Sequence, residues 1–155
     1  MRVALSCDHR GAHLYDALAN LLTGDGHELV SGILSCDGDP CDYPDMAYSV
    51  CRAVVDGEAD TGMLVCGSGI GMSIAANKFP GVRAALVHDD ITAEVSRRHN
   101  DANVLCLSAD LLGQPLIEKI AQIWLATEFE GGRHTRRLKK ISAIEAGQDP
   151  SAVAN

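Results

Sequence analysis

Short apolar runs alternate with amphipathic segments along most of the chain, and this alternation limits the possible folds more than any other feature. The apolar runs are short enough to be strands, and they span 2–6, 27–33, 61–66, 82–87 and 103–108. Helical stretches are expected between them, at 12–23, 45–56, 92–99 and 113–127. A further helix is expected after the glycines that follow residue 66, and it should end at about residue 78. Strands that alternate with helices form parallel sheets with right-handed crossovers. The pattern therefore predicts one α/β domain with a doubly wound, five-stranded parallel sheet.

The composition agrees with a sheet that is covered by helices on both faces. The 155 residues suit a single domain, and 46% of them are apolar, enough for a sizeable core. Only 4% are aromatic, so aliphatic side chains must fill the interior. A Gly-Gly pair at 131–132 precedes a basic helical stretch. We expect the domain to span 1–145, with a disordered tail at 146–155.

Charge and hydropathy exclude several classes of protein. The net charge of −8 argues against nucleic acid or an anionic membrane as a partner. No run of about 18 apolar residues is present, so we predict no membrane span. The N-terminus turns polar after five residues, too early for a signal peptide, and the cytoplasm is the expected compartment. The six cysteines would be reduced there. Cys36 and Cys41 stay open as a disulfide or half a metal site, but no second close pair completes a site, and we predict no metal.

The stretch CGSGIGMSIAANK, residues 66–78, is the strongest functional signal. Its three glycines let backbone N–H groups turn toward one point, and the helix that follows adds its positive end, so the loop is a predicted anion site. A phosphate-loop kinase motif is absent, and Met72 stands where a cysteine phosphatase needs arginine. A dinucleotide site stays as an alternative, because Asp89 lies 20 residues beyond Gly69 at the end of the next strand. The glycine spacing differs from that motif, however.

The other use of such a loop is an oxyanion hole for an enediolate. Cys66 would lie at a helix N-terminus, where we expect its pKa to fall toward neutrality. It could then take a proton from a carbon beside a carbonyl, while Ser68 shuttles a second proton. The alternative is that Cys66 is a buried strand residue without chemistry. The loop alone leaves both interpretations open.

Further candidates lie where strands and helices end. Asp8 and His9 directly follow the first strand, at the sheet edge where ligands bind in α/β folds. Asp8 could equally cap the next helix. His99 ends a helix, where the dipole favours its charged form, although a plain C-cap with Asn100 in a left-handed conformation also explains this segment.

Basic residues gather near the C-terminus. Five of the 13 Lys and Arg residues fall within 133–140. Arg133 and Arg137 are four residues apart, so their guanidinium groups share one helix face that suits a phosphate. The alternative is a solvated cationic face.

Six segments, in order, resemble the ribose-5-phosphate isomerase B family, which also includes aldose–ketose isomerases of other sugar phosphates. They are CDHRG at 7–11, DYPD at 42–45, CGSGIGMSIAANK at 66–78, GVRAAL at 81–86, RRHNDANVL at 97–105 and FEGGRHTRRLKKI at 129–141. The resemblance implies a Rossmann-like fold and a homodimer, with a tetramer as the alternative. It implies active sites between subunits, a C-terminal helix that packs on the partner subunit, a phosphorylated sugar as substrate, and no cofactor.

The resemblance also implies roles for individual residues. Cys66 would be the base that moves a proton between C1 and C2, and His99 would assist opening of the sugar ring. Ser68 stands where the family often has threonine. The anion hole would be formed by Gly67, Gly69, Ile70, Gly71 and Met72. Sugar hydroxyls or the ring oxygen would be bound by Asp8, Tyr43 and Asn100, and the phosphate by His9, Arg133 and Arg137.

One position departs from the family pattern. After the fifth strand the family usually has Gly-x-Arg, with the arginine near the phosphate, whereas this chain has Asp110. We expect Asp110 to point away from the phosphate and to pair with Arg10 or Arg136. The leading hypothesis is isomerisation of ribose 5-phosphate to ribulose 5-phosphate. The alternatives are a hexose or tetrose phosphate as substrate, a nucleotide-binding oxidoreductase domain, and a non-catalytic sugar-phosphate binder.

Overall fold

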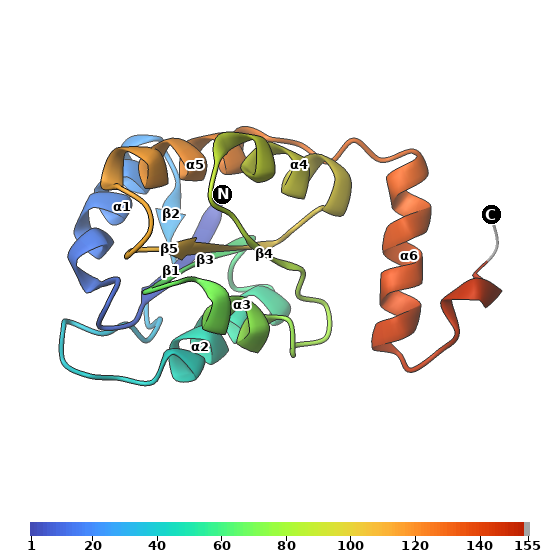
Figure 1. The fold of residues 1–155 in the computed structure, drawn as a ribbon, viewed down its shortest axis with the longest axis horizontal. Helices are drawn as coiled ribbons and strands as arrows, with labels where there is room; N and C mark the ends of the chain where they lie inside the picture. Colours follow the sequence, from blue (N-terminus) through green and yellow to red (C-terminus); the bar gives the residue numbers. More distant parts are fainter. Residues whose placement is uncertain (154–155) are drawn as a thin grey trace.

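The centre of the molecule is a five-stranded parallel sheet with the strand order β2-β1-β3-β5-β4 (Figure 1). The structure is a computed structural model that describes residues 1–153. The strands are β1 (Arg2–Cys7), β2 (Glu28–Leu29), β3 (Thr61–Cys66), β4 (Ala84–Leu86) and β5 (Val104–Ser108). The strand order changes direction between β1 and β3, the place where α/β sheets bind ligands. The predicted α/β class and the five parallel strands are confirmed.

Helices cover both faces of this sheet. They are α1 (Ala12–Gly24), α2 (Tyr43–Val55), α3 (Ile70–Ala76), α4 (Asp90–Asn100), α5 (Gln114–Ala126) and α6 (Arg133–Glu145), followed by the short 3-10 helix η1 (Pro150–Ala152). Helices α1, α4 and α5 pack on one face, and α2 and α3 pack on the other (Figure 1). None of the helices within residues 1–153 is both long and apolar enough to cross a bilayer.

Strand β3 shows why the central strands are continuous apolar runs. All six of its residues are buried, because each face of the sheet is covered. Side chains alternate between the faces, so Met63 and Val65 join the core under α1 and α5. Leu64 and Cys66 join the core under α2 and α3. The Cys66 side chain therefore lies on the face where α3 begins.

The edge strands are shorter than the sequence predicts. The run at 27–33 forms only the two-residue β2, and the run at 82–87 forms only β4. Each edge strand has a single neighbour, and the chain leaves β2 to form a long loop. Cys36 and Cys41 form a disulfide in this loop, so the expectation of six reduced cysteines is wrong at these two positions. Cys7, Cys51, Cys66 and Cys106 are free and buried.

Helix α6 stands apart from the two layers, beyond the edge of the sheet (Figure 1). The C-terminal end of α6 contacts the rest of the domain through Glu145, whose Oε1 accepts a hydrogen bond of 2.9 Å from the Gly81 N–H. A groove of about 410 Å³ lies between α6 and β4, and Ile141 and Ile144 line it from α6. Ile144 is 60% exposed in the single chain. This helix therefore presents apolar surface that the chain itself does not bury.

The segment after α6 is short. Its described residues, 146–153, form a turn and η1, and Lys140 donates a hydrogen bond of 3.0 Å to the Pro150 carbonyl. Residues 154–155 lie outside the described part of the chain. Disorder of this tail in solution stays a prediction.

Candidate active site

Cys66 is the last residue of the central strand and lies under the glycine loop. It pairs with Ser108 of β5 in the sheet register, and its Sγ accepts a hydrogen bond of 3.2 Å from the Gly69 N–H. The backbone N–H groups of Met72 and Ser68 also approach the sulfur closely enough to lower the pKa of the thiol. Three backbone donors therefore surround the Cys66 sulfur.

Burial has the larger effect on the Cys66 thiol. Loss of contact with water raises its pKa above the ordinary value, and the N–H groups of Met72, Gly69 and Ser68 offset only part of the rise. The negative charge of Asp8 raises the pKa further. The expected fall toward neutrality is therefore wrong, and Cys66 is a neutral thiol at pH 7 in the single chain.

The glycines of the loop leave room for side chains that lie against it. Gly69 is left-handed with φ of 73°, and a Cβ there would lie 2.5 Å from Leu86 Cδ1. A Cβ on Gly71 would lie 2.7 Å from the ring of Tyr43, the first residue of α2. Tyr43 is thus in contact with the glycine loop, as its predicted role in substrate binding requires. Ser68 is half-buried, and its Oγ accepts a hydrogen bond of 3.3 Å from the Ile70 N–H.

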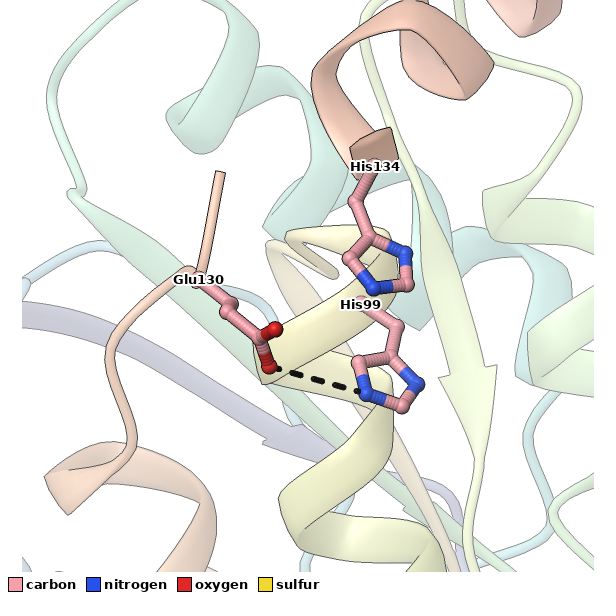
Figure 2. A group of neighbouring side chains, drawn as sticks. All are labelled: His99, Glu130 and His134. Atoms are coloured by element: carbon pink, nitrogen blue, oxygen red, sulfur yellow. Dashed lines mark ion pairs between the residues drawn. The ribbon is translucent and has the colours of Figure 1, made fainter. Parts of the chain in front are cut away.

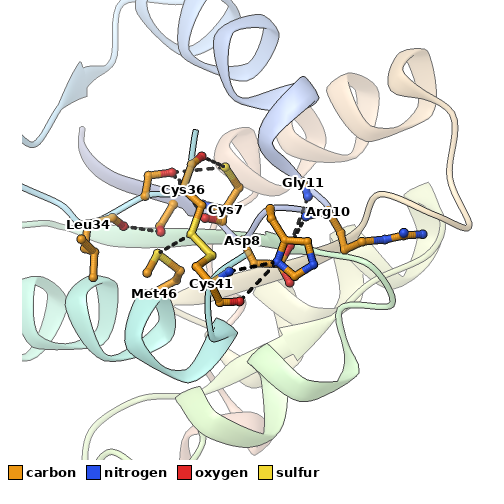
Figure 3. Close-up of a disulfide and its surroundings, with 11 residues drawn as sticks. Cys7, Asp8, Arg10, Gly11, Leu34, Cys36, Cys41 and Met46 are labelled. Carbon is orange, nitrogen blue, oxygen red and sulfur yellow. Dashed lines mark hydrogen bonds between the residues drawn. A yellow bond between two sulfur atoms is a disulfide. The ribbon is translucent and has the colours of Figure 1, made fainter. Parts of the chain in front are cut away.

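Asp8 and His9 follow strand β1 beside the same loop. The buried Asp8 donates its N–H to the Val65 carbonyl at 3.0 Å, so it lies next to the end of β3. Its Oδ1 accepts hydrogen bonds from the N–H groups of Arg10 and Gly11, at 2.8 and 3.1 Å (Figure 3). Asp8 therefore orders the turn before α1, and the N-cap residue itself is Gly11.

The loop closed by the disulfide reaches the exposed His9. His9 Nδ1 lies 3.3 Å from the Cys41 carbonyl oxygen and 3.4 Å from the Cys41 nitrogen. Cys36 donates its N–H to the Cys7 carbonyl at 3.1 Å, so the loop also contacts the last residue of β1 (Figure 3). This segment supports one side of the candidate site, and only the pair of cysteines pointed to it in the sequence.

His99 and Asn100 lie at the opposite end of the sheet from Cys66. Helix α4 starts beyond the carboxyl end of β4 and runs back, so it ends near the amino ends of the strands. The Asn103 carbonyl, just after α4, accepts hydrogen bonds from Thr61 Oγ1 at 2.8 Å and from the Gly62 N–H at 2.9 Å. Thr61 begins β3 and Cys66 ends it, a length of about 16 Å. One chain therefore does not bring the predicted base and the predicted ring-opening histidine together.

His99 belongs to a second cluster, with Glu130 and His134 (Figure 2). Its ring stacks on that of His134, with centroids 4.3 Å apart and planes 4° from parallel. Glu130 Oε2 lies 3.8 Å from His99 Nε2 and 3.0 Å from an Arg98 nitrogen. The cluster joins the end of α4 to the start of α6. The sequence analysis missed Glu130 and His134, and their only signal was their place in the last of the six segments that resemble the family.

The same cluster is the only described group of His, Cys, Asp and Glu side chains in residues 1–153 that lies close enough together to hold a metal ion. Its ligand atoms all lie within 4.8 Å of one another. Parallel stacked rings direct their nitrogen lone pairs along parallel planes, so one ion would require a ring to leave the stack. Burial lowers the pKa of His134, and the charges of His99, Arg133 and Arg137 lower it further. The geometry favours a packing contact between the two rings, and the lowered pKa of His134 disfavours its charged form.

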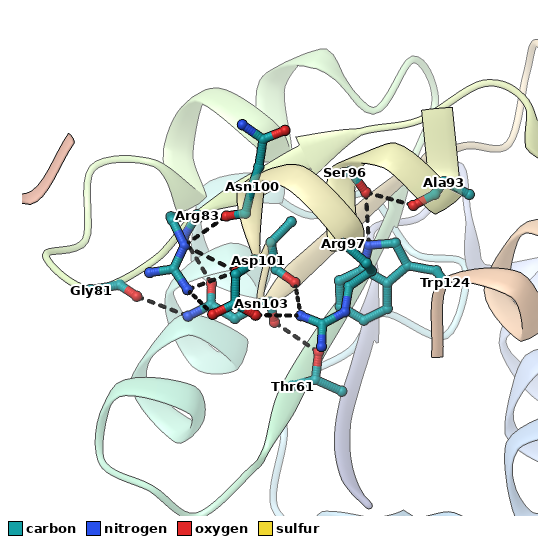
Figure 4. A network of polar contacts seen from close by, with 11 residues as sticks. Thr61, Gly81, Arg83, Ala93, Ser96, Arg97, Asn100, Asp101, Asn103 and Trp124 are labelled. Carbon is teal, nitrogen blue, oxygen red and sulfur yellow. Dashed lines mark hydrogen bonds and ion pairs between the residues drawn. The ribbon is translucent and has the colours of Figure 1, made fainter. Parts of the chain in front are cut away.

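A polar network ends α4 and positions Asn100 (Figure 4). Arg83 Nε donates to the Asn100 and Asp101 carbonyls, both at 3.0 Å, and the Asp101 carboxylate pairs with Arg83 and Arg97 at 3.1 and 3.2 Å. Asp101 has φ of 44°, so the left-handed residue is Asp101, and the expectation of a left-handed Asn100 is wrong. The carboxylate can pair with both arginines from this position.

Arg133 and Arg137 project from α6 and are exposed. Arg133 Nε donates to His134 Nε2 at 3.3 Å, which links the first arginine to the stacked histidines. Asp110 follows β5 and pairs with Arg10, with Arg10 Nη2 and Asp110 Oδ1 2.9 Å apart, one of the two pairings expected from the sequence. The candidate residues thus form two groups. One surrounds the glycine loop, and the other follows α4 and α6.

Comparisons with known proteins identify the family of the chain. The family model described as Ribose/Galactose Isomerase matches residues 3–141. The ribose-5-phosphate isomerase B of Escherichia coli is 42% identical over 145 residues, covering 93% of this chain and 96% of that protein. The D-erythrulose-4-phosphate isomerase of Pectobacterium atrosepticum is 36% identical, covering 94% and 95%. The structure of Clostridium thermocellum ribose-5-phosphate isomerase B has a TM-score of 0.90 and 41% identity, covering 95% of this chain and 99% of that one.

Proposed function

Because the chain belongs to the ribose/galactose isomerase family, we propose that it interconverts ribose 5-phosphate and ribulose 5-phosphate. The observation that carries the proposal is the position of Cys66. Its sulfur lies at the end of the central strand, with backbone donors of the glycine loop around it and Asp8 beside it. That arrangement suits removal of a proton from carbon together with binding of the oxyanion that results.

In the proposed reaction, Cys66 as thiolate removes the proton from C2 of the open-chain aldose. The electron pair moves into the C1–C2 bond, and the negative charge that develops on the C1 oxygen is held by the loop N–H groups. The protonated Cys66 then returns the proton to C1, while Ser68 helps to move a proton from the C2 hydroxyl to the C1 oxygen. Every proton removed is returned, so the reaction needs no electron donor or cofactor. Because burial raises the pKa of Cys66, we expect the rate to increase with pH as more of the thiolate forms.

We also propose that the functional unit is a homodimer with shared sites. The residues around the glycine loop of one subunit form a carboxyl-edge group, which consists of Asp8, His9, Tyr43, Cys66 and the loop itself. This group would be completed by the α6 group of a second copy, which consists of His99, Asn100, Arg133 and Arg137. The distance of about 16 Å along β3 supports this, because no rotamer change within one chain spans it. The exposed Ile141 and Ile144 on α6 and the groove beside them support it as well, since a second subunit would bury them. A tetramer of two such dimers is the alternative. We keep the cytoplasm as the predicted compartment.

The nucleotide-binding alternative loses its support in the sheet order. Strand β5 lies between β3 and β4, so Asp89 is not on the strand next to the glycine loop. Its Oδ1 also accepts a hydrogen bond of 2.7 Å from the Thr92 N–H as the N-cap of α4. A tetrose phosphate is the second candidate substrate, because one relative is named D-erythrulose-4-phosphate isomerase.

A panel of aldose phosphates, assayed for ketose formation without added cofactor, tests the proposal. We expect ribose 5-phosphate to give the highest kcat/KM, with tetrose and hexose phosphates as competitors in parallel assays. The Cys66→Ala variant is the negative control. Absence of isomerisation with the whole panel would refute the proposal, and tight NADH binding measured by fluorescence would favour the nucleotide-binding alternative.

A further inference from the structure

Arg10 and Asp110 form an ion pair that lies directly on the glycine loop. Arg10 Nη2 is 2.9 Å from Asp110 Oδ1, and Arg10 Nε donates to Asp110 Oδ2 at 3.3 Å. A Cβ on Gly67 would lie 2.7 Å from Asp110 Oδ2 and 3.6 Å from Arg10 Cγ. Gly67 is the residue directly after Cys66, so the pair lies beside the residue that is expected to do the chemistry.

Hydrogen bonds of their own backbone N–H groups fix the positions of both residues. The Asp110 N–H donates to the Gly67 carbonyl at 2.9 Å, and the Ala109 N–H donates to the Cys66 carbonyl at 2.9 Å. The Arg10 N–H is held at 2.8 Å by the buried Asp8 carboxylate. The two side chains therefore start from fixed positions just after the ends of β5 and β1, the strands on either side of β3, and meet over the loop.

This geometry leaves part of the guanidinium group available to a ligand. An arginine has five N–H donors, and the contact with Asp110 uses the Nε edge and one Nη2 hydrogen. Among the described residues, Nη1 has no hydrogen-bond partner, and the Arg10 side chain is 58% exposed. Asp110 in turn prevents the guanidinium from swinging away, because two parallel contacts fix the orientation of an arginine better than one.

We infer that Arg10 binds the phosphate of the substrate through Nη1, and that Asp110 is a positioning residue that aims it. The inference rests on the proposed function and adds to it a residue that sets specificity for phosphorylated substrates. His9, the neighbour of Arg10, lies at the same edge of the sheet. The unfavourable charge of Asp110 is thus balanced by a cation that stands closer to the ligand.

Steady-state kinetics with ribose 5-phosphate, and inhibition by inorganic phosphate, test this inference. We expect Arg10→Gln to raise both KM and the inhibition constant of phosphate by about tenfold or more, with kcat within about threefold. Asp110→Asn should change KM by less than about threefold, because the amide oxygen keeps one of the two contacts with Arg10 while a repulsive charge is lost. Adding Asp110→Arg to Arg10→Gln should recover most of the loss, since it returns a cation to the same edge.

A matched control is Arg52→Gln, which removes another exposed arginine that pairs with a carboxylate, Asp56, at 2.6 Å on α2. This variant should keep KM within about twofold of the parent. The melting temperatures of all variants should stay close to that of the parent, because exposed ion pairs contribute little to stability. The inference is wrong if Arg10→Gln leaves KM and phosphate inhibition within twofold of the parent, or if it lowers kcat alone.

Failure of the proposed function would look different. Binding of inorganic phosphate to the Cys66→Ala variant, measured by calorimetry, does not depend on turnover. If the protein isomerises no sugar phosphate but Arg10→Gln lowers its phosphate affinity, the inference about Arg10 holds and the proposed reaction is wrong. If the protein isomerises ribose 5-phosphate equally well with Arg or Gln at position 10, the proposed reaction holds and the inference about Arg10 is wrong.

Discussion

Mixing two inactive variants should restore activity, because the candidate residues lie in two groups at opposite ends of the sheet. In a subunit with Cys66→Ala the carboxyl-edge group is defective, and in a subunit with Arg133→Ala the α6 group is defective. A hybrid dimer then contains one site with both defects and one site with none. Random exchange of equal amounts places about half of the dimers in hybrids, so the mixture should reach about one quarter of the parent activity.

The background should be low enough for this recovery to be measured. Loss of a general base typically costs 10²–10⁴-fold, so Cys66→Ala homodimers contribute almost nothing. Loss of a charge-assisted contact from Arg133 should cost roughly 10–100-fold in kcat/KM, which an assay well below KM reports in full. Subunits with two different affinity tags allow hybrids to be isolated and counted before the assay.

The matched control is a mixture of Cys66→Ala with Asp8→Ala. Both changes fall in the carboxyl-edge group, so every site of a hybrid keeps one defect and no activity should return. The reasoning from the sheet geometry would be refuted if isolated Cys66→Ala/Arg133→Ala hybrids were no more active than this control. Both residues would then act within one chain, and α6 would have to leave its observed position beside α4.

Three further predictions concern the thiol and the disulfide. Cys66→Ala should lower kcat by about 10²–10⁴-fold while phosphate affinity by calorimetry stays within about threefold of the parent; near-normal kcat would make Cys66 only a packed strand residue. Because burial raises the pKa of Cys66, kcat/KM should rise with pH between about 7 and 9 as thiolate forms, and a flat profile would contradict a neutral resting thiol. Replacing Cys36 and Cys41 together by Ser should lower the free energy of unfolding by about 2 kcal/mol for so short a loop, as measured by urea denaturation. It should also raise KM, since His9 loses its support from the Cys41 backbone, and an unchanged KM with reduced stability would separate the loop from the site.

Short-range patterns were sufficient to predict several elements of the fold. The run TGMLVC coincides with β3, because a strand buried on both faces requires an apolar residue at every position. Pro115 lies in the first turn of α5, where its missing N–H costs nothing. The glycine loop, Asp8, His9 and Tyr43 gather at one edge because parallel strands end together there. These outcomes depend on short-range periodicity and on topology, which neighbouring residues encode.

Contacts between segments that are distant in the sequence depend on how the whole chain packs. The sign of the Cys66 pKa change depends on how completely α2, α3 and the sheet remove water from the sulfur, and no local motif reports that balance. The separation of His99 from Cys66 follows from the direction in which α4 runs back along the sheet. The contacts of Arg10 with Asp110, 100 residues further along the chain, and of His99 with His134 join segments that only the packing brings together. Distances of this kind depend on the whole fold, because each is set by every strand and helix that lies between the two residues.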